Sequence, residues 1–266
     1  MSVAPVEIDR LAPTHRPPGR AIGYHRWTNL CFLHWRLPAE KIAALLPPAL
    51  TLDTWEGDAW VGLVPFGMSG VRPWWSPWGF AFAETNVRTY VHCQGRDPGV
   101  WFFSLEAANS LAVRIARRFW GLNYFRAAMS LRRERDRVEY RSRRLWPGAA
   151  QAGLALAAEI GPPLENSTSG RAVPGTLEHF LFERYLLYAQ RRGRLLRGQV
   201  HHAPYALRSA QATSLQESLL AANGIEADGG PCHVAFSERV DVEIFSLASL
   251  PRRGAAGRRS PLGLCF

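Results

Sequence analysis

Residues 80–93 read Phe-Ala-Phe-Ala-Glu-Thr-Asn-Val-Arg-Thr-Tyr-Val-His-Cys, which has the period-two alternation of a long β-strand. One face of this strand carries small and β-branched residues and is an ordinary packing face. The other face places an acid, an amide and a guanidinium between aromatic rings: Phe80, Phe82, Glu84, Asn86, Arg88, Tyr90 and His92. A face turned to water would need no function, whereas an inward face would need partners for its charges. The pattern leaves both interpretations open.

The rest of the chain predicts further strands and a few inserted helices. Strands are expected at residues 27–37, 60–66, 100–105, 125–133, 138–144, 154–160, 194–201, 204–212 and 233–247. Helices are expected at residues 38–46, 108–120, 177–190 and 215–222. Many strands with few helices indicate an α+β fold with a largely antiparallel sheet.

Composition points to a globular chain. Of the 266 residues, 47% are hydrophobic, which is enough for a sizeable core. No apolar run approaches the ~20 residues of a membrane span, and the first residues do not form a signal peptide. We therefore expect a cytoplasmic location and no membrane partner. The formal net charge of +10 comes from arginines spread along the chain, with no nucleic-acid motif, so we do not expect nucleic-acid binding.

Several common catalytic and cofactor motifs are missing from the sequence. It has no G-x-S-x-G, H-E-x-x-H, G-x-x-x-x-G-K-[ST] or G-x-G-x-x-G phrase. None of its four cysteines forms a C-x-x-C pair. We therefore expect no metal and no organic cofactor.

Four longer phrases carry a family resemblance. They are Leu46-Pro47-Pro48-Ala49-Leu50, Trp60-Val61-Gly62-Leu63-Val64-Pro65-Phe66, Glu84-Thr85-Asn86-Val87-Arg88-Thr89-Tyr90-Val91, and Gly99-Val100-Trp101-Phe102-Phe103-Ser104-Leu105. Together they resemble the YqjF-like family, a bacterial domain of unknown function (2071). That family is similar in turn to the acetoacetate decarboxylase superfamily. The resemblance implies an acetoacetate decarboxylase-like bent antiparallel β-barrel or double sheet, with helices packed outside and a closed pocket.

The same resemblance sets the expected domain limits. It places a single YqjF-like domain at residues 21–250, preceded by an N-terminal arm at 1–20 and followed by a loosely ordered basic tail at 251–266. Because members of the superfamily assemble, it also implies a possible homo-oligomer.

In the decarboxylases a pocket lysine forms a Schiff base with the substrate. In this chain the nucleophile position implied by the resemblance holds Tyr124, and the position of its neighbouring lysine holds Phe125. The single lysine, Lys41, lies on a predicted helix near the N-terminus, where a solvated charge is expected. The decarboxylase acid matches Glu84. The acid is therefore kept while the nucleophile is lost.

Two main functional hypotheses follow. In the first, a lyase- or isomerase-like enzyme acts on a small organic acid or carbonyl compound without a Schiff base. Glu84 is then the general acid or base, and Tyr124 donates a hydrogen bond or proton. The remaining candidates contact the substrate: Arg88, Asn86, Arg26, Ser104 and Glu106. In the second, the domain binds a metabolite or regulates without catalysis. Nucleic-acid binding through the arginines is a third, weaker hypothesis.

Overall fold

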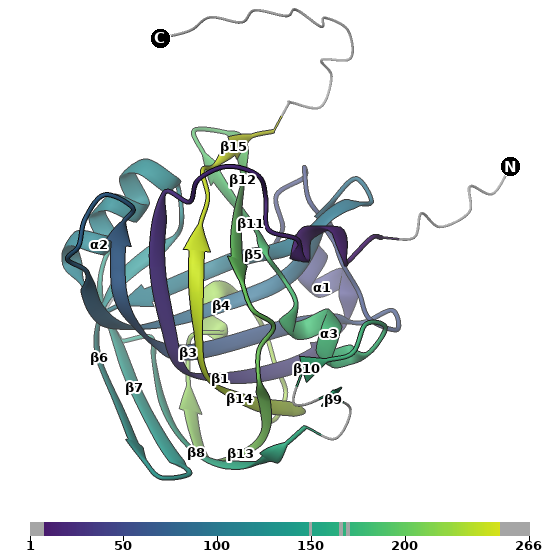
Figure 1. Ribbon diagram of the computed structural model, residues 1–266. Helices are drawn as coiled ribbons and strands as arrows, with labels where there is room; N and C mark the ends of the chain where they lie inside the picture. The colour runs from purple at the N-terminus through teal and green to yellow at the C-terminus, as the bar shows by residue number, and fades with distance from the viewer. Residues whose placement is uncertain (1–7, 149–150, 165–166, 169–170, 251–266) are drawn as a thin grey trace, which may run out of the picture.

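The computed structural model describes residues 8–148, 151–164, 167–168 and 171–250, and strands dominate it (Figure 1). The strands are β1 (Gly23–Leu37), β2 (Thr51–Leu52), β3 (Ala59–Pro73), β4 (Phe80–Cys93), β5 (Arg96–Ala107), β6 (Tyr124–Glu134), β7 (Arg137–Trp146), β8 (Gly153–Pro163), β9 (Ser167–Thr168), β10 (Arg171–Ala172), β11 (Leu186–Arg191), β12 (Arg194–His202), β13 (Leu207–Glu217), β14 (His233–Ile244) and β15 (Ala248–Ser249). The helical segments are η1 (Ala12–Thr14), α1 (Ala39–Ala43), α2 (Ser110–Ile115), η2 (Ala116–Trp120), α3 (Leu177–Phe182) and η3 (Ala221–Asn223). The predicted C-terminal tail lies outside the described residues.

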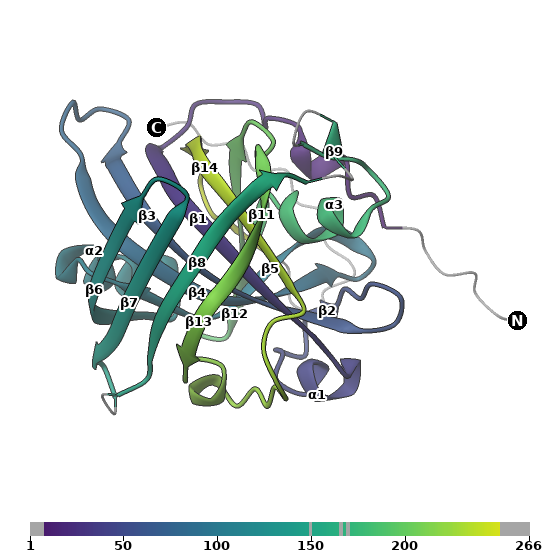
Figure 2. The ribbon, with the colours of Figure 1, turned by 90° about the horizontal axis from the view of Figure 1, so that it is seen from below.

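Strand pairing closes two circuits that share a wall. The sheet runs β15-β12-β11-β5-β6-β7-β8-β13-β14-β1-β3-β4-β2, with additional pairings of β4 with β5 and of β12 with β14. The first pairing closes an outer circuit through β6, β7, β8 and β13, which Figure 2 shows in front of β1, β3 and β4. The second closes an inner circuit through β11 and β12. Strands β14, β1, β3, β4 and β5 belong to both circuits and form the shared wall.

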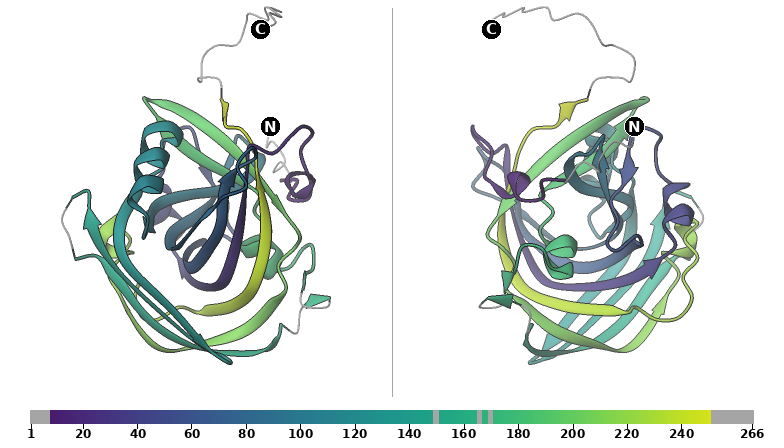
Figure 3. Two further views of the ribbon diagram at one scale, coloured as in Figure 1. Left: turned by 60° about the vertical axis from the view of Figure 1, so that its left-hand side comes forward. Right: turned by 90° about the vertical axis from the view of Figure 1, so that its right-hand side faces the viewer.

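Each circuit encloses its own hydrophobic core. The outer core contains Leu33, Leu63 and Val87 from the shared wall, packed against Leu156 of β8. The inner core contains aromatic and aliphatic side chains from the other face of the wall and from α3: Phe32, Phe66, Tyr90, Phe180 and Phe182 among them. In the left view of Figure 3 the outer strands, teal to green, curve around the inner ones. Because both faces of the wall are covered, both faces of β4 are buried from Glu84 to Val91.

This double burial settles the orientation that the pattern of β4 left open. Glu84, Asn86, Arg88 and Tyr90 point into the inner circuit, and Val87 points into the outer core. The strand spans Phe80–Cys93, as predicted. The α+β fold with a largely antiparallel sheet is likewise confirmed.

Two predicted helices differ from the structure. The helix expected at 177–190 ends at Phe182, and the chain continues as β11. Tertiary packing overrides the helical pattern here: Leu187 and Tyr188 pair in parallel with Val100 and Trp101, and the buried Tyr188 donates a hydrogen bond to the Asp97 carbonyl. The helix expected at 215–222 is wrong as well, because β13 continues to Glu217 and only the single turn η3 follows.

Candidate functional site

The site is centred on a buried pair formed by Glu84 of β4 and Tyr124 at the start of β6. The Tyr124 hydroxyl donates a hydrogen bond to Glu84 Oε2 at 2.8 Å. Backbone contacts fix the start of β6: Arg117 Nη1 donates to the Tyr124 carbonyl at 2.7 Å, and Asn123 Nδ2 donates to the Phe103 carbonyl at 2.6 Å. Tyr124 also pairs with Leu105 in the parallel register of β5 and β6. The phenol is therefore held against the acid by several elements.

Burial sets the protonation of this pair. Loss of solvation raises the pKa of Glu84 to about 8; the Tyr124 hydrogen bond lowers it and the nearby Glu106 charge raises it. The pKa of Tyr124 is raised well above its ordinary value by burial and by Glu84. At neutral pH the pair is thus a protonated acid beside a neutral phenol. If a proton leaves this pair, the negative charge stays on the Glu84 carboxylate and not on the phenol, because Glu84 is the stronger acid of the two.

An apolar cavity of about 320 Å³ opens at Tyr124. Its walls come from β1, β3, β4, α2 and η2 and are mostly apolar: Ile22, Met68, Val71, Phe80, Phe82, Leu111, Ile115, Trp120 and Ile244 among them. The polar side chains on its wall are Tyr124, His25 and Arg72. Glu84 does not line the cavity. It reaches a ligand only through the Tyr124 hydroxyl.

His25 is a cavity residue that sequence reasoning missed. Burial lowers its pKa to about 4, so the imidazole is neutral and can donate or accept one hydrogen bond. The strand was expected to start at Trp27, whereas β1 starts at Gly23. If the predicted strand had been extended by two residues, the period-two alternation would have placed His25 on the same face as Trp27. Its neighbour Arg26 points outward and pairs with the exposed Asp241 at 2.6 Å, so the structure does not bring Arg26 to this cavity.

Asn86 and Arg88 lie further along β4 than Glu84, toward the end of the strand at Cys93. Four residues of extended strand separate Glu84 from Arg88, about 13 Å. Arg88 is buried, its Nη2 donates to the Leu181 carbonyl at 3.4 Å, and its Nε has no partner among the described residues. Asn86 Oδ1 is likewise unpaired there. The structure therefore places Arg88 on the predicted face but not beside Tyr124.

The surroundings of Arg88 carry no compensating charge. In the described part of the chain no carboxylate lies within ion-pair distance of its guanidinium. Burial keeps the pKa of His34 well below its ordinary value and raises the pKa of Tyr90, so both neighbours are neutral. Gly62 packs closely against both His34 and Arg88, because a Cβ there would lie 3.3 Å from His34 Cδ2 and 3.4 Å from Arg88 Cγ. A buried cation without a counter-charge is costly unless an anion joins it.

Ser104 and Glu106 face the outer circuit. Val87 pairs with Ser104 but the next residue, Arg88, pairs with Phe102, so Phe103 is an extra residue in a β-bulge. The bulge reverses the alternation, so Ser104 and Glu106 lie on the opposite face from Phe102. Neither residue lines the Tyr124 cavity, so the structure does not bring these two predicted substrate contacts there. Glu106 instead accepts from Ser104 at 3.3 Å and from two nitrogens of the buried Arg144, one at 3.0 Å.

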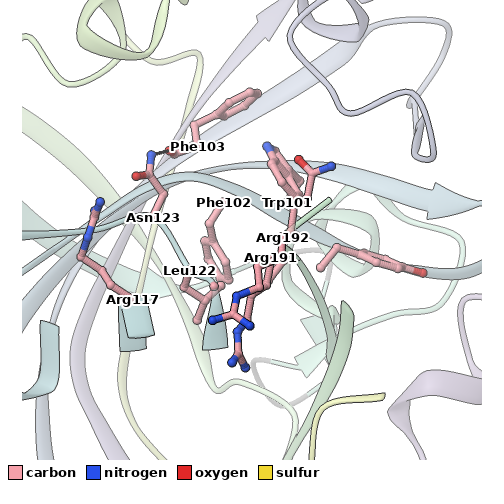
Figure 4. A pocket seen from close by; sticks show the side chains of 12 residues that line it. Trp101, Phe102, Phe103, Arg117, Leu122, Asn123, Arg191 and Arg192 are labelled. Carbon is pink, nitrogen blue, oxygen red and sulfur yellow. Dashed lines mark hydrogen bonds between the residues drawn. The ribbon is translucent and has the colours of Figure 1, made fainter. Parts of the chain in front are cut away.

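A second, more polar hollow lies on the other side of Arg117. It has a volume of about 440 Å³ and is lined by Arg117, Arg191, Arg192 and Asn123, with Phe102 and Leu122 (Figure 4). In Figure 4 the side chains of Arg191 and Arg192 point in the same direction. Lys41 is far from either hollow: it is exposed on α1 and pairs with Glu226 at 3.3 Å.

The two closed strand circuits have the acetoacetate decarboxylase-like fold. The fold is similar to that of the enduracididine biosynthesis enzyme MppR complexed with the condensation product of pyruvate and imidazole 4-carboxaldehyde (TM-score 0.57, 10% identity, 89% of this chain and 90% of that one). It is also similar to acetoacetate decarboxylase from Legionella pneumophila (TM-score 0.55, 13% identity, 93% and 99%). At such low identity the likeness is one of fold.

Sequence comparison gives the family. The chain belongs to the DUF2071 family of uncharacterized conserved proteins, whose pattern matches residues 24–241. It is 34% identical over 234 residues to the uncharacterized protein YqjF of Bacillus subtilis (strain 168), covering 87% of this chain and 93% of that one. The predicted family is thereby confirmed. No helix in the residues that the structure describes has the length and apolar character needed to cross a membrane.

Proposed function

We propose that this protein is a lyase- or isomerase-like enzyme that binds a small, largely apolar carbonyl compound or organic acid at the Tyr124 cavity. The observation that carries the proposal is the Tyr124–Glu84 hydrogen bond behind an apolar cavity, with the pKa of Glu84 raised to about 8. A buried acid with a raised pKa, hydrogen-bonded to a side chain that lines a cavity, supports acid–base chemistry.

Each residue has a defined part in this proposal. The Tyr124 hydroxyl donates a hydrogen bond to the carbonyl oxygen and stabilises the negative charge that develops there. For this the hydroxyl turns its hydrogen from Glu84 to the ligand and accepts a hydrogen bond from the protonated Glu84. Glu84 passes its proton to Tyr124 as Tyr124 gives its own to the carbonyl oxygen, which leaves Tyr124 neutral and Glu84 as a carboxylate. The charge balances when His25 removes a proton from a neighbouring atom of the ligand and becomes an imidazolium. His25, neutral and on the same wall, is placed to exchange a proton at a neighbouring atom of the ligand. Lys41 takes no part, so no Schiff base forms on this chain's own residues.

Arg88 and Asn86 supply the second part of the proposal. Arg88 Nε and Asn86 Oδ1 are buried without a partner among the described residues, and neither residue lines the Tyr124 cavity. We assign Arg88 to an anionic group, and Asn86 to a hydrogen-bond donor, of a ligand bound inside the inner circuit. A carboxylate there would neutralise the guanidinium and accept its hydrogen bonds.

The test is a thermal-shift screen of small carbonyl compounds and carboxylates, followed by product analysis of every compound that stabilises the protein. For a converted compound, Tyr124→Phe and Glu84→Gln should each lower kcat by about 100-fold or more. Tyr185→Phe is the matched control, because Tyr185 also donates to a buried acid, Glu183, but neither residue lines the cavity. Unchanged kcat in Tyr124→Phe would refute the assignment.

The absent lysine favours a second candidate function, a domain that binds a metabolite without converting it. In that case compounds would stabilise the protein, Tyr124→Phe would weaken their binding, and no product would form with any of them.

A further inference from the structure

The mouth of the Tyr124 cavity is surrounded by exposed apolar side chains. Ile22, Phe80, Leu111 and Ile115 line the cavity and are themselves exposed to solvent. The loop between β3 and β4 adds Trp74, Trp75 and Trp78. We call these residues, together with Phe119, the mouth surface.

The β3–β4 loop contributes the most prominent part of the mouth surface. Trp75 is 69% exposed and Trp78 is 84% exposed. The loop is held in place: the Trp74 amide donates to the Ile22 carbonyl at 3.0 Å, and the Arg20 guanidinium lies 3.5 Å from the Trp74 ring centre. Three exposed tryptophans within five residues are unusual, because large aromatic side chains are mostly withdrawn from water.

The helical part of the mouth surface has a similar character. Leu111, Ile115 and Phe119 recur at four-residue spacing along α2 and η2, and all three are exposed. The spacing predicts the helix correctly, yet the stripe faces solvent and not a core. In Figures 1 and 2 α2 lies at the left-hand edge of the molecule.

The charge around the mouth surface is strongly positive. The segments that build it, residues 59–83 and 107–133, contain no acidic residue. Arg114 and Arg118 are exposed on the helical stripe, and the hollow lined by Arg117, Arg191 and Arg192 adjoins it. A second copy of this face would oppose arginines to arginines in a twofold interface, so the charge favours a negatively charged partner.

We propose that the mouth surface docks on an anionic lipid bilayer, with Trp75 and Trp78 in the interfacial region and the arginines against lipid headgroups. Tryptophan is enriched where membranes meet water because its ring is apolar while its N–H is polar. Anionic headgroups attract nearby arginines. The expectation of no membrane partner rested on the lack of a spanning segment and does not concern a surface of this kind. Docking would place the cavity mouth directly against the lipid.

Cosedimentation of the full chain with phosphatidylcholine vesicles, with and without phosphatidylglycerol, tests the proposal. Binding should require phosphatidylglycerol and weaken as salt is raised. The double variant Trp75→Ser/Trp78→Ser should lower the partition coefficient by about 10-fold or more, and Arg114→Gln by about 5-fold. Leu45→Ser and Arg132→Gln are matched controls, because both residues are exposed elsewhere, on the turn after α1 and on β6, and these variants should bind like the wild type.

Three outcomes would overturn the proposal. The first is vesicle binding that the tryptophan and control variants reduce equally. The second is concentration-dependent self-association, measured by light scattering without lipid, that the tryptophan variant abolishes. The third is binding to mixed-sequence RNA or DNA with no partition onto phosphatidylglycerol vesicles. Because each measurement uses binding alone, failure here leaves the proposed chemistry at Tyr124 untouched, and loss of turnover there leaves this proposal untouched.

Discussion

The two faces of the shared wall both bury an acid and an arginine, but they arrange them differently. On the outer face Glu106 and Arg144 are joined by two hydrogen bonds, and the charges cancel. On the inner face Glu84 accepts a hydrogen bond from the Tyr124 phenol. Arg88, four residues further along β4, has no carboxylate partner among the described residues. The charges of Glu106 and Arg144 are therefore paired without a ligand, whereas the charge of Arg88 is not. This difference favours the inner face as the binding face that we propose.

The largest expected effect comes from breaking the complete pair. Arg144→Met leaves the buried Glu106 carboxylate without a cation and with only the Ser104 hydroxyl donating to it, which should lower the free energy of unfolding by about 3–5 kcal/mol. The double variant Glu106→Leu/Arg144→Met removes both charges and should recover most of that loss. Urea unfolding measures both. If the double variant is as unstable as the single one, the pair is not the reason for the loss.

A smaller effect should follow from pH at Glu84. Its folded-state pKa of about 8 exceeds its ordinary value of 4.5, so the folded protein keeps a proton that the unfolded chain releases. The stabilisation from this group is therefore complete below about pH 4.5 and is lost as pH rises to about 8.

Glu84→Gln cannot titrate, so its loss of stability over that window should be smaller than that of the wild type by roughly 2–4 kcal/mol. Urea unfolding at several pH values measures the difference. Parallel pH profiles for the two proteins would show that the acid ionises normally.

The smallest expected change in stability is at the unpaired cation. Arg88→Met removes a buried charge that has a long hydrogen bond and aromatic neighbours but no carboxylate partner among the described residues, so the free energy of unfolding should change by about 1 kcal/mol or less, or rise. The same substitution should abolish stabilisation by any carboxylate that protects the wild type. If Arg88→Met destabilises the protein as much as Arg144→Met, Arg88 contributes as much to stability as the paired arginine, and the proposed difference between the two faces is wrong.

The sequence predicted the wall strand well and its relation to other strands less well. Alternation from Phe80 to Cys93 identified the strand and the residues that share a face with Glu84, because β-pleating is a local property. It did not decide whether that face points inward. The position of Tyr124 beside Glu84 followed from family resemblance. The separation of Arg88 from the Tyr124 cavity was not predicted, because two residues on the same face of a strand can still lie far apart along it.

Some features had no local signal at all. The bulge at Phe103, which turns Ser104 and Glu106 to the outer core, depends on the register with β4. The end of α3 at Phe182 depends on strand pairing with Val100 and Trp101. Both are decided by contacts between residues that are distant in sequence, so reading along the chain does not reveal them.

The shared wall also limits how this protein family can diversify. Any shift of β4 that changed the interior of the inner circuit would also displace Val87 in the outer core. A substitution in the shared wall therefore disturbs the packing of both cores. The β3–β4 loop and α2 contribute to one side only. New ligand preferences are therefore expected to arise at the rim, while the wall stays fixed across relatives.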